Sequence, residues 1–406
     1  MMNALVNARI VTDDGIIGDG VLLHDGGKIK DIGRRDEIAI PEGTAVLDCG
    51  GLIAGPGLVD IHCHGGGTTW FYEDPVAAAQ HHLLGGTTSL CCTLYHSQDF
   101  DTTLRAIEMI RGACESGLPG NIVGIHFEGP YLSPKYGASS KTARRPDPVE
   151  YRTYLHNADG LIRQWSFSPE VEGVEPFVDE VLARGIPMSF AHSEAGPELI
   201  FKYAAKGVSI CTHIMDATGC SISPTRWPGT REVGFDEAVM LCRNVMTEVI
   251  PDELGIHVRA LMCKFLLQAV GIDRIVVVTD CTAFDATKES AVAGAGENGV
   301  AGQLSVSGRK DSIESADINI VNGEVYGSRL LMCRAVRNFM AHTGIGIADA
   351  FRVGAANPAR AIHMQDQIGS LTVGKRANVI LVDEAFNLKT VMLDGEVAVQ
   401  GGLIVG

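Results

Sequence analysis

Two histidines separated by one residue follow a short apolar segment near the start of the chain, within Leu58–Gly67 (LVDIHCHGGG). Side chains alternate between the two faces of a β-strand, so His62 and His64 are expected to point the same way and Cys63 to face away and pack. Imidazole is a common metal ligand, and two at one strand end could form half of a metal site. A polar pair that merely closes a strand would have the same pattern, so this motif alone leaves both interpretations open.

Four further apolar segments end in residues that can bind a metal ion or transfer a proton. One ends in Glu128, which a Gly-Pro pair follows at once. Its carboxylate could ligate or bridge a metal ion, although a lone glutamate is more often a solvated loop charge. His126 shares the face of Glu128 and is expected to be a core imidazole or to support a ligand. The other three segments place one such residue each directly after an apolar run: His192, His213 and Asp280.

A glutamate and two histidines suit a catalytic zinc ion that keeps a position open for water. Glu128, His192 and His213 would supply this set. His62 and His64 could complete a second metal position, so one or two divalent ions per chain are expected. Zinc is the ion that these ligands favour, although the order of metal affinities alone does not fix the native metal.

Asp280 is expected to act as the general base and acid of the reaction. It would take a proton from the water and return it to a leaving nitrogen. This chemistry is accessible at neutral pH because a bound metal ion lowers the pKa of water to about 7.

Composition restricts the class of protein. The chain has 406 residues and a net charge of −16, which argues against a nucleic acid as partner. It shows no apolar leader segment and no apolar run approaching the roughly 20 residues of a membrane span, so we expect no membrane association. Its eleven cysteines include no C-x-x-C pair and are typical of reduced thiols. These features predict a cytoplasmic protein.

The middle of the chain, about residues 55–365, alternates short apolar strands with helical segments. Eight strands are predicted, at Leu58–His62, Thr88–Cys92, Ile122–Phe127, Ile162–Phe167, Pro187–Ala191, Val208–Thr212, Arg243–Glu248 and Ile275–Thr279. Six helices are predicted between and after them, at Pro75–Leu84, Phe100–Ser116, Val174–Arg184, Pro197–Lys206, His257–Val270 and Arg329–His342. Eight such units predict an α/β fold, a TIM-like (β/α)8 barrel with its site at the carboxyl ends of the strands. An open doubly wound sheet is the alternative, but no G-x-G-x-x-G follows an early strand.

Both ends of the chain have a different pattern. Short apolar runs are separated by Asp-Gly turns, as at Asp14-Gly15 and Asp394-Gly395, which is a strong signal for β-hairpins. We therefore predict two domains. Residues 1–54 plus 376–406 would form a small β-sandwich built from both termini, and residues 55–375 would form the barrel.

The order His-x-His, Glu-Gly-Pro, His, His, Asp resembles the amidohydrolase superfamily. Within it, the chain is similar to the N-acetylglucosamine-6-phosphate deacetylases, and the likeness spans nearly the whole sequence. Asn357–Asp383 resembles that family's return from the barrel to the small domain. The segments that carry the metal-site likeness are Gly124–Leu132 (GIHFEGPYL), Cys211–Ala217 (CTHIMDA) and Ile275–Thr282 (IVVVTDCT).

The resemblance implies the same metal-binding and catalytic roles as above, with a glutamate in place of the carboxylated lysine of many amidohydrolases. His62 and His64 match a pair that only some deacetylases retain. Arg231 resembles an arginine that reaches the phosphate in a neighbouring subunit, which implies a homodimer. Surface or helix-capping duty is the alternative for Arg231 and His257. The implied substrate-binding residues are Gly137, Ser139, Asp216, Ala217, Arg231 and His257.

The sequence departs from that family around the substrate. The family usually has a histidine and an asparagine shortly after Gly137, where this chain has Ser139 and Ser140. Asp216 replaces an asparagine, and its carboxylate would repel a phosphate by like charge. The lid segment is also altered, at 325–328. The basic loop 135–145 could hold an anion differently, although a solvated loop is the default expectation.

Three hypotheses follow. The leading one is a metal-dependent amide hydrolase that deacetylates N-acetylglucosamine 6-phosphate or a close amino-sugar phosphate. The second keeps the chemistry but changes the substrate to an unphosphorylated amino-sugar derivative, an N-acyl amino acid or a cyclic amide. The third is a non-catalytic barrel that binds a sugar, for which a full ligand set plus Asp280 would have no purpose.

Overall fold

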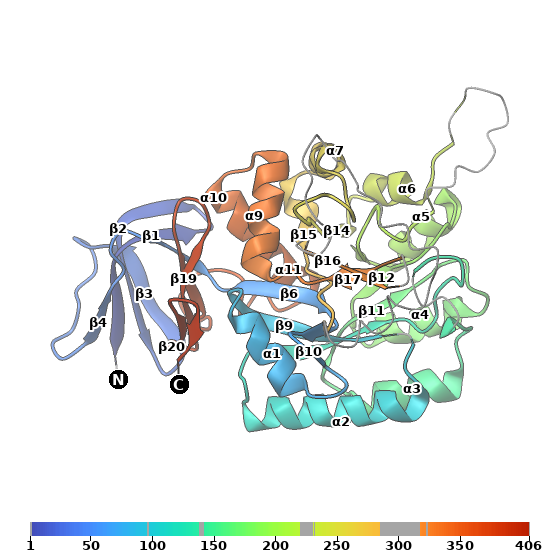
Figure 1. Cartoon of the computed structure of the whole chain (residues 1–406), viewed down its shortest axis with the longest axis horizontal. Coiled ribbons are helices and arrows are strands. Elements are labelled where there is room, and N and C mark those ends of the chain that lie inside the picture. Colours follow the sequence, from blue (N-terminus) through green and yellow to red (C-terminus); the bar gives the residue numbers. More distant parts are fainter. Residues whose placement is uncertain are drawn as a thin grey trace, which may run out of the picture.

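The computed structural model is dominated by a parallel barrel that carries a smaller sheet at one side (Figure 1). Within the described residues, no helix is both long enough and apolar enough to cross a lipid bilayer. The structure describes residues 2–95, 97–137, 142–219, 230, 232–284, 317–321 and 324–405.

Eight parallel strands form the barrel, in the order β15-β14-β13-β12-β11-β10-β9-β6. Each overlaps one of the predicted strands. They are β6 (Leu58–Cys63), β9 (Thr87–Tyr95), β10 (Ile122–Glu128), β11 (Ile162–Phe167), β12 (Met188–Phe190), β13 (Ile210–Cys211), β14 (Met246–Val249) and β15 (Ile275–Val277). The first and last strands meet just beyond β15, where a parallel bridge joins Cys63 and Cys281. The predicted barrel is confirmed, and the open doubly wound alternative is not observed.

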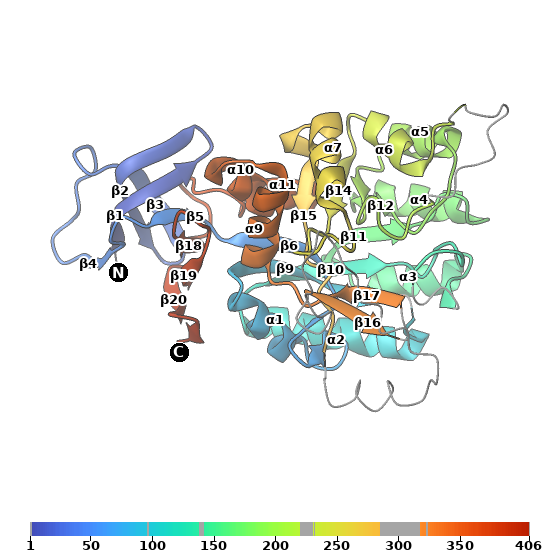
Figure 2. The ribbon, with the colours of Figure 1, turned by 45° about the horizontal axis from the view of Figure 1, so that its top comes forward.

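Helices cover the outside of the barrel, with α1–α3 on one side and α5–α7 on the opposite side in both views (Figures 1 and 2). They are α1 (Pro75–Leu83), α2 (Phe100–Ser116), α3 (Pro148–Asn157), α4 (Val174–Ala183), α5 (Pro197–Lys206), α6 (Phe235–Leu241), α7 (Ala260–Val270), α9 (Met332–Thr343), α10 (Ile347–Phe351) and α11 (Asn357–Ala361). A 3₁₀ turn, η2 (Ile272–Arg274), precedes β15, and a π-helical turn, η5 (Arg352–Ala356), joins α10 to α11.

All six predicted helices are present, but α7 and α9 each begin three residues later than expected. The backbone N–H groups of Ile256 and His257 both donate to the Asp252 carboxylate, at 2.9 Å. These bonds hold residues 252–257 in a turn. The helical hydrogen-bond pattern can therefore begin only after it, at Ala260.

The two ends of the chain form one nine-stranded, largely antiparallel sheet, and both termini lie in it (Figure 1). Its strands are β1 (Asn3–Thr12), β2 (Gly15–Asp25), β3 (Lys28–Arg34), β4 (Ala45–Asp48), β5 (Ile53–Pro56), β18 (Val379–Val382), β19 (Leu388–Leu393), β20 (Glu396–Gln400) and β21 (Leu403–Ile404). The small β unit built from both termini is thus confirmed. The division of domains at residue 54 stays a prediction, and β5 runs two residues past it.

Two short hairpins lie near the carboxyl end of the barrel. One consists of β7 (Gly65–Gly66) and β8 (Thr69–Trp70), directly after the His-x-His motif. The other consists of β16 (Ile318–Val321) and β17 (Glu324–Ser328), which comes forward in Figure 2. Residues 325–327 of β17 line the cavity at the candidate active site, which is described below.

A close approach of backbone to aromatic rings joins the small sheet to the barrel. A Cβ atom added to Gly55 in β5 would lie 2.2 Å from Cζ of Phe351. The Phe351 ring is 2% exposed and lies 5.0 Å, centroid to centroid, from the ring of Phe386. Only glycine leaves room for these rings against β5.

We expect Gly55→Ala to lower the free energy of unfolding by about 1–3 kcal/mol, because the new methyl group overpacks a filled core. The midpoint of urea unfolding measures the change. Gly112→Ala is the matched control, since Gly112 lies inside α2 with nothing within 4 Å of the new Cβ. That control should gain up to about 1 kcal/mol. Equal midpoints for Gly55→Ala and wild type would contradict the packing argument.

Candidate active site

The candidate active site lies at the carboxyl ends of the barrel strands, where the barrel prediction placed it. The structure brings together all six residues predicted as metal ligands or as the catalytic acid and base. Each lies within three residues of the end of a barrel strand and is at most 8% exposed. They are His62, His64, Glu128, His192, His213 and Asp280.

The carboxylate of Glu128 lies between two pairs of histidines. Its Oε1 atom is 2.8 Å from Nε2 of His192 and 3.1 Å from Nε2 of His213. Its Oε2 atom is 3.3 Å from Nε2 of His64. One carboxylate therefore touches both pairs, which is the arrangement of a bridging ligand.

Asp280 closes the side of the cluster formed by the His-x-His pair. Its Oδ1 atom is 3.1 Å from Nε2 of His64 and 3.4 Å from Nε2 of His62. The two imidazole Nε2 atoms are themselves 3.3 Å apart. Two groups of three residues thus have ligand atoms within 4.8 Å of one another: His62, His64 and Asp280, and His62, Glu128 and His213.

Hydrogen bonds on the far side of two rings favour a particular tautomer. Nδ1 of His62 lies 3.0 Å from Oε2 of Glu248, and Nδ1 of His213 lies 3.1 Å from the backbone oxygen of Asp216. Both partners are acceptors, so each Nδ1 donates and each Nε2 turns a lone pair toward Glu128. Lone pairs facing carboxylate oxygens repel unless a cation lies between them. This donor set therefore fits a divalent metal ion.

The pKa values reflect the same demand for positive charge. Burial alone would lower the pKa of His62, but Glu128 and Asp280 raise it well above its ordinary value. Burial would raise the pKa of Glu128, and the surrounding imidazoles hold it well below its usual range. Burial lowers the pKa of His213, yet contact with Glu128 raises it to about 9. The carboxylates therefore favour cations at their centre, whether protons on imidazole or a metal ion.

Three of these residues have left-handed backbone conformations, which residues other than glycine rarely adopt. The φ angles are 46° at His192, 24° at His213 and 48° at Asp280. Such strain is typical of functional sites, where the surrounding structure holds it. The turns direct three side chains into the cluster immediately after their strands end.

A cavity of about 330 Å³ opens onto the cluster. Three of the predicted substrate-binding residues line it: Gly137, Asp216 and Ala217. Ser139 and Arg231 lie outside the described residues. The rest of its described lining consists of His64, Tyr95, Glu128, Lys135, Tyr136, His192, His213, Asp280, Thr282, Val325, Tyr326 and Gly327.

Gly137 needs to be glycine at this place. Its φ angle is 88°, and an added Cβ atom would lie 2.5 Å from Nδ1 of His192. The chain therefore passes directly over the ring of a candidate ligand.

His257 is buried beside the site rather than on the cavity wall. It is 7% exposed, and its Nδ1 atom lies 3.1 Å from Oδ2 of Asp252. Burial lowers its pKa, but Asp252 and Asp216 raise it above its ordinary value. The burial rules out the surface alternative, and the cap of α7 is Arg259.

Residues 53–398 match the model of the amidohydrolase family. The chain belongs to the amidohydrolase family.

Known proteins resemble this amidohydrolase over nearly its whole length. It is 28% identical to the N-acetylglucosamine-6-phosphate deacetylase of Bacillus subtilis (strain 168), over 96% of this chain and 95% of that protein. It is 25% identical to the N-acetylgalactosamine-6-phosphate deacetylase of Escherichia coli O157:H7, over 98% of this chain and 100% of that protein. The crystal structure of N-acetylglucosamine-6-phosphate deacetylase from Pasteurella multocida matches with a TM-score of 0.79 and 27% identity, covering 98% of this chain and 99% of that chain. The predicted resemblance is confirmed.

His126 is a core imidazole in this amidohydrolase, which is one of the two roles predicted for it. Its Nδ1 atom lies 3.2 Å from Oγ1 of Thr93, and its Nε2 atom lies 2.7 Å from Oγ of Ser166. With both nitrogens engaged, burial and the neighbouring His62 keep its pKa well below the ordinary value. Its ring packs edge-on against His62, at 4.7 Å between centroids, and so supports a candidate ligand.

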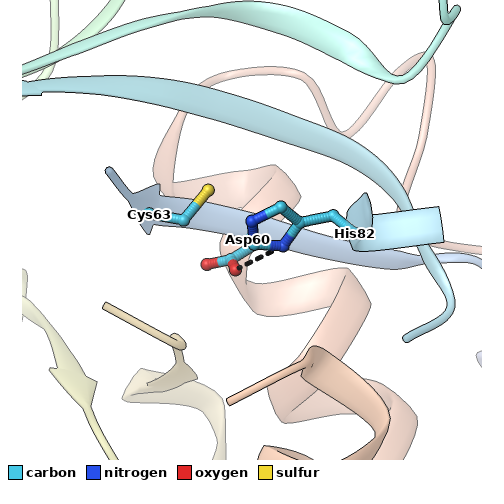
Figure 3. A group of neighbouring side chains, drawn as sticks. All are labelled: Asp60, Cys63 and His82. Carbon is cyan, nitrogen blue, oxygen red and sulfur yellow. Dashed lines mark ion pairs between the residues drawn. The ribbon is translucent and has the colours of Figure 1, made fainter. Parts of the chain in front are cut away.

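A third group of side chains that could hold a metal ion lies at β6 and α1: Asp60, Cys63 and His82 (Figure 3). Most of its ligand atoms are already hydrogen-bonded, while Nδ1 of His82, which has no hydrogen-bond partner among the described residues, lies 3.9 Å from Oδ2 of Asp60. Asp60 accepts hydrogen bonds from Oγ1 of Thr279 at 2.6 Å and from the backbone N–H of His62 at 3.3 Å. The thiol of Cys63 donates to a backbone carbonyl, and so does Nε2 of His82. We therefore assign this group to packing, as the alternation rule predicted for Cys63.

The described cations of the basic loop 135–145 are already paired with carboxylates. Lys135 pairs with Glu194, Arg144 with Glu150, and Arg145 with Glu172. Lys141 lies outside the described residues. The described part of this loop thus offers no unpaired cation to an anionic ligand.

Glu248 is the residue that the sequence prediction missed. It lies in β14, is completely buried, and contacts His62 directly. The signal that identified Glu128, a carboxylate near the end of an apolar strand, was equally present at Glu248.

We expect the purified amidohydrolase to contain a divalent metal ion. We expect Glu128→Gln to bind this ion more weakly by a factor of at least about 10–100. Loss of a residue that only supports a ligand already has an effect of that size. Chelation should lower the Tm of the wild type, because the ion binds the folded state. Elemental analysis and thermal unfolding check both expectations. Glu150→Gln, a carboxylate hydrogen-bonded in α3, is the control and should keep its metal. Unchanged metal content in Glu128→Gln would contradict the assignment.

Proposed function

We propose that this amidohydrolase removes the acetyl group from N-acetylglucosamine 6-phosphate, or from a closely related amino-sugar phosphate. The observation that carries the proposal is the buried carboxylate of Glu128 between two histidine pairs, with Asp280 beside them at a cavity. Relatives that span almost the whole chain and are named as amino-sugar phosphate deacetylases support the choice of substrate.

The metal would be held by residues of known geometry. Glu128, His192 and His213 would bind one divalent ion, and His62 and His64 together with Glu128 would complete a second position. Zinc suits this mixture of imidazole and carboxylate. A bound ion polarises the amide carbonyl and lowers the pKa of water to about 7.

Asp280 would move the proton. Burial would raise the pKa of its carboxyl group, but His62 and His64 lower it below the ordinary value, so it is ionised at neutral pH. It lines the cavity and can accept a proton from the attacking water. It then delivers that proton to the leaving nitrogen as the carbon–nitrogen bond breaks. The products are acetate and the free amine, and the carboxylate is regenerated.

The charges of the cavity lining support a second candidate function, in which the same hydrolysis acts on a different substrate. Lys135 is the one lysine or arginine among the described lining residues, and it is paired with Glu194. Asp216 adds a negative charge to the wall, which disfavours a phosphate. An unphosphorylated amino-sugar derivative, an N-acyl amino acid or a cyclic amide is therefore the alternative substrate.

The assembly belongs to the proposal as well. Arg231 would reach the phosphate bound in a neighbouring subunit, so the enzyme would work as a homodimer. Its place of action would be the cytoplasm.

Amine release from a panel of acetylated sugars tests the choice of substrate. We expect fast release from N-acetylglucosamine 6-phosphate or its 4-epimer and slow release from unphosphorylated N-acetylglucosamine, with metal measured on the same sample. The reverse preference would select the alternative substrate. Bound metal without release from any of the three sugars would leave the hydrolase in place and exclude the amino-sugar substrates.

We expect Asp280→Asn to lower kcat by about 10²–10⁴-fold, the contribution typical of general acid and base catalysis. The amide has the same size but cannot take up the proton. Steady-state kinetics measure the effect, and elemental analysis verifies that metal remains bound. Asp179→Asn on the exposed face of α4 is the control and should keep full activity. More than a tenth of wild-type activity in Asp280→Asn would exclude this role.

A further inference from the structure

Glu248 is a fully buried carboxylate that contacts the candidate metal ligand His62. Its Oε2 atom lies 3.0 Å from Nδ1 of His62 and 3.4 Å from the backbone nitrogen of His213. Its Oε1 atom accepts a hydrogen bond of 2.6 Å from Nε2 of Gln164 in β11. The two oxygens are thus occupied by one ring, one amide and one backbone N–H.

The charge of Glu248 has a single balancing partner. Within the part of the chain that the structure describes, its one ion pair is with His62. A buried carboxylate without compensating positive charge is strongly destabilising. An ionised Glu248 therefore needs compensating charge on the His62 ring or on a cation that the ring binds.

We propose that Glu248 is a positioning residue of the metal centre. It holds His62 as the Nδ1–H tautomer, with Nε2 directed at His64 and Glu128, and its charge strengthens binding of the ion at the His62–His64 position. This inference rests on the proposed metal-dependent function. His64 has no equivalent support, because its Nδ1 atom has no hydrogen-bond partner among the described residues. Among the described residues, Glu248 is therefore the one hydrogen-bond partner that orients a ring of this pair through Nδ1.

A count of charges points the same way. Three buried carboxylates contact His62: Glu128, Asp280 and Glu248. If the histidines are neutral, one divalent ion balances only part of the negative charge of the three carboxylates. Two divalent ions supply enough positive charge to balance all of it. A carboxylate whose ion pair is with His62 is thus expected in a centre that holds an ion at the His62–His64 position.

Glu248→Gln separates the charge from the geometry. The amide oxygen can still accept from Nδ1 of His62, and its NH2 group then faces Gln164. Oε1 of Gln164 has no hydrogen-bond partner among the described residues, so Gln164 can turn its amide and accept from the new NH2 group. The variant therefore keeps size and hydrogen bonds and loses only the charge.

The experiment is a chelator titration of the zinc-loaded protein, with zinc per chain measured at each step. Wild type should release zinc in two steps, and His62→Gln identifies the step that belongs to the His62–His64 position. We expect Glu248→Gln to weaken that step by about 10–100-fold, the effect typical of residues that orient metal-binding histidines. The other step should not move. Glu150→Gln, a hydrogen-bonded carboxylate in α3, is the matched control and should match wild type in both steps.

Each result decides a separate point. Two unchanged steps in Glu248→Gln, or an equal shift of both, would overturn the positioning role. Wild type with a single zinc step that His62→Gln leaves unmoved would also overturn it, while leaving a one-metal deacetylase in place. Wild type that holds no metal and releases no amine would overturn the proposed function itself. If Glu248→Gln does not fold, Glu248→Asp replaces it, since the shorter side chain keeps the charge but loses the contact with His62. The same selective loss is then expected.

Discussion

The buried charge of Glu128 is the constraint on which the site depends. Its side chain is 2% exposed, and a carboxylate in such surroundings needs several cationic or hydrogen-bonding partners to remain ionised. Its partners are the imidazoles of His64, His192 and His213, which lie at three other strand ends. Each is more than 60 residues from Glu128 along the chain, one before it and two after it. Only a rigid framework can hold them at 2.8–3.3 Å. A barrel supplies that framework, because all its strands end on one face.

Closure of the barrel and assembly of the site are the same structural event. The first and last strands, β6 and β15, meet where the backbone N–H of Asp280 donates to the carbonyl of His62 at 2.9 Å. The N–H of His64 donates in turn to the carbonyl of Cys281 at 2.7 Å, and Asp60 accepts from Oγ1 of Thr279. Bonds that seal the barrel thereby place Asp280 against the His-x-His pair.

Local rules predicted the framework well and the connections between its parts less well. Strand alternation placed His62 and His64 together and Cys63 behind them, because alternation needs no knowledge of distant residues. The contact between His62 and Glu248 spans 186 residues, and only the closed barrel reveals it. The left-handed turns at His192 and His213 were equally hidden, since nothing in their sequence marks the strain.

The candidate metal ligands and the residues that would recognise the substrate are positioned by different kinds of structural element. The candidate metal ligands lie at strand ends, whereas much of the cavity wall is formed by loops and a hairpin, which tolerate change. Residue 216 belongs to both. Its backbone oxygen fixes the ring of His213 at 3.1 Å, and that bond is the same for any side chain. Its side chain lines the cavity. An aspartate at this position therefore changes the charge of the cavity wall, while the backbone hydrogen bond that orients His213 stays the same.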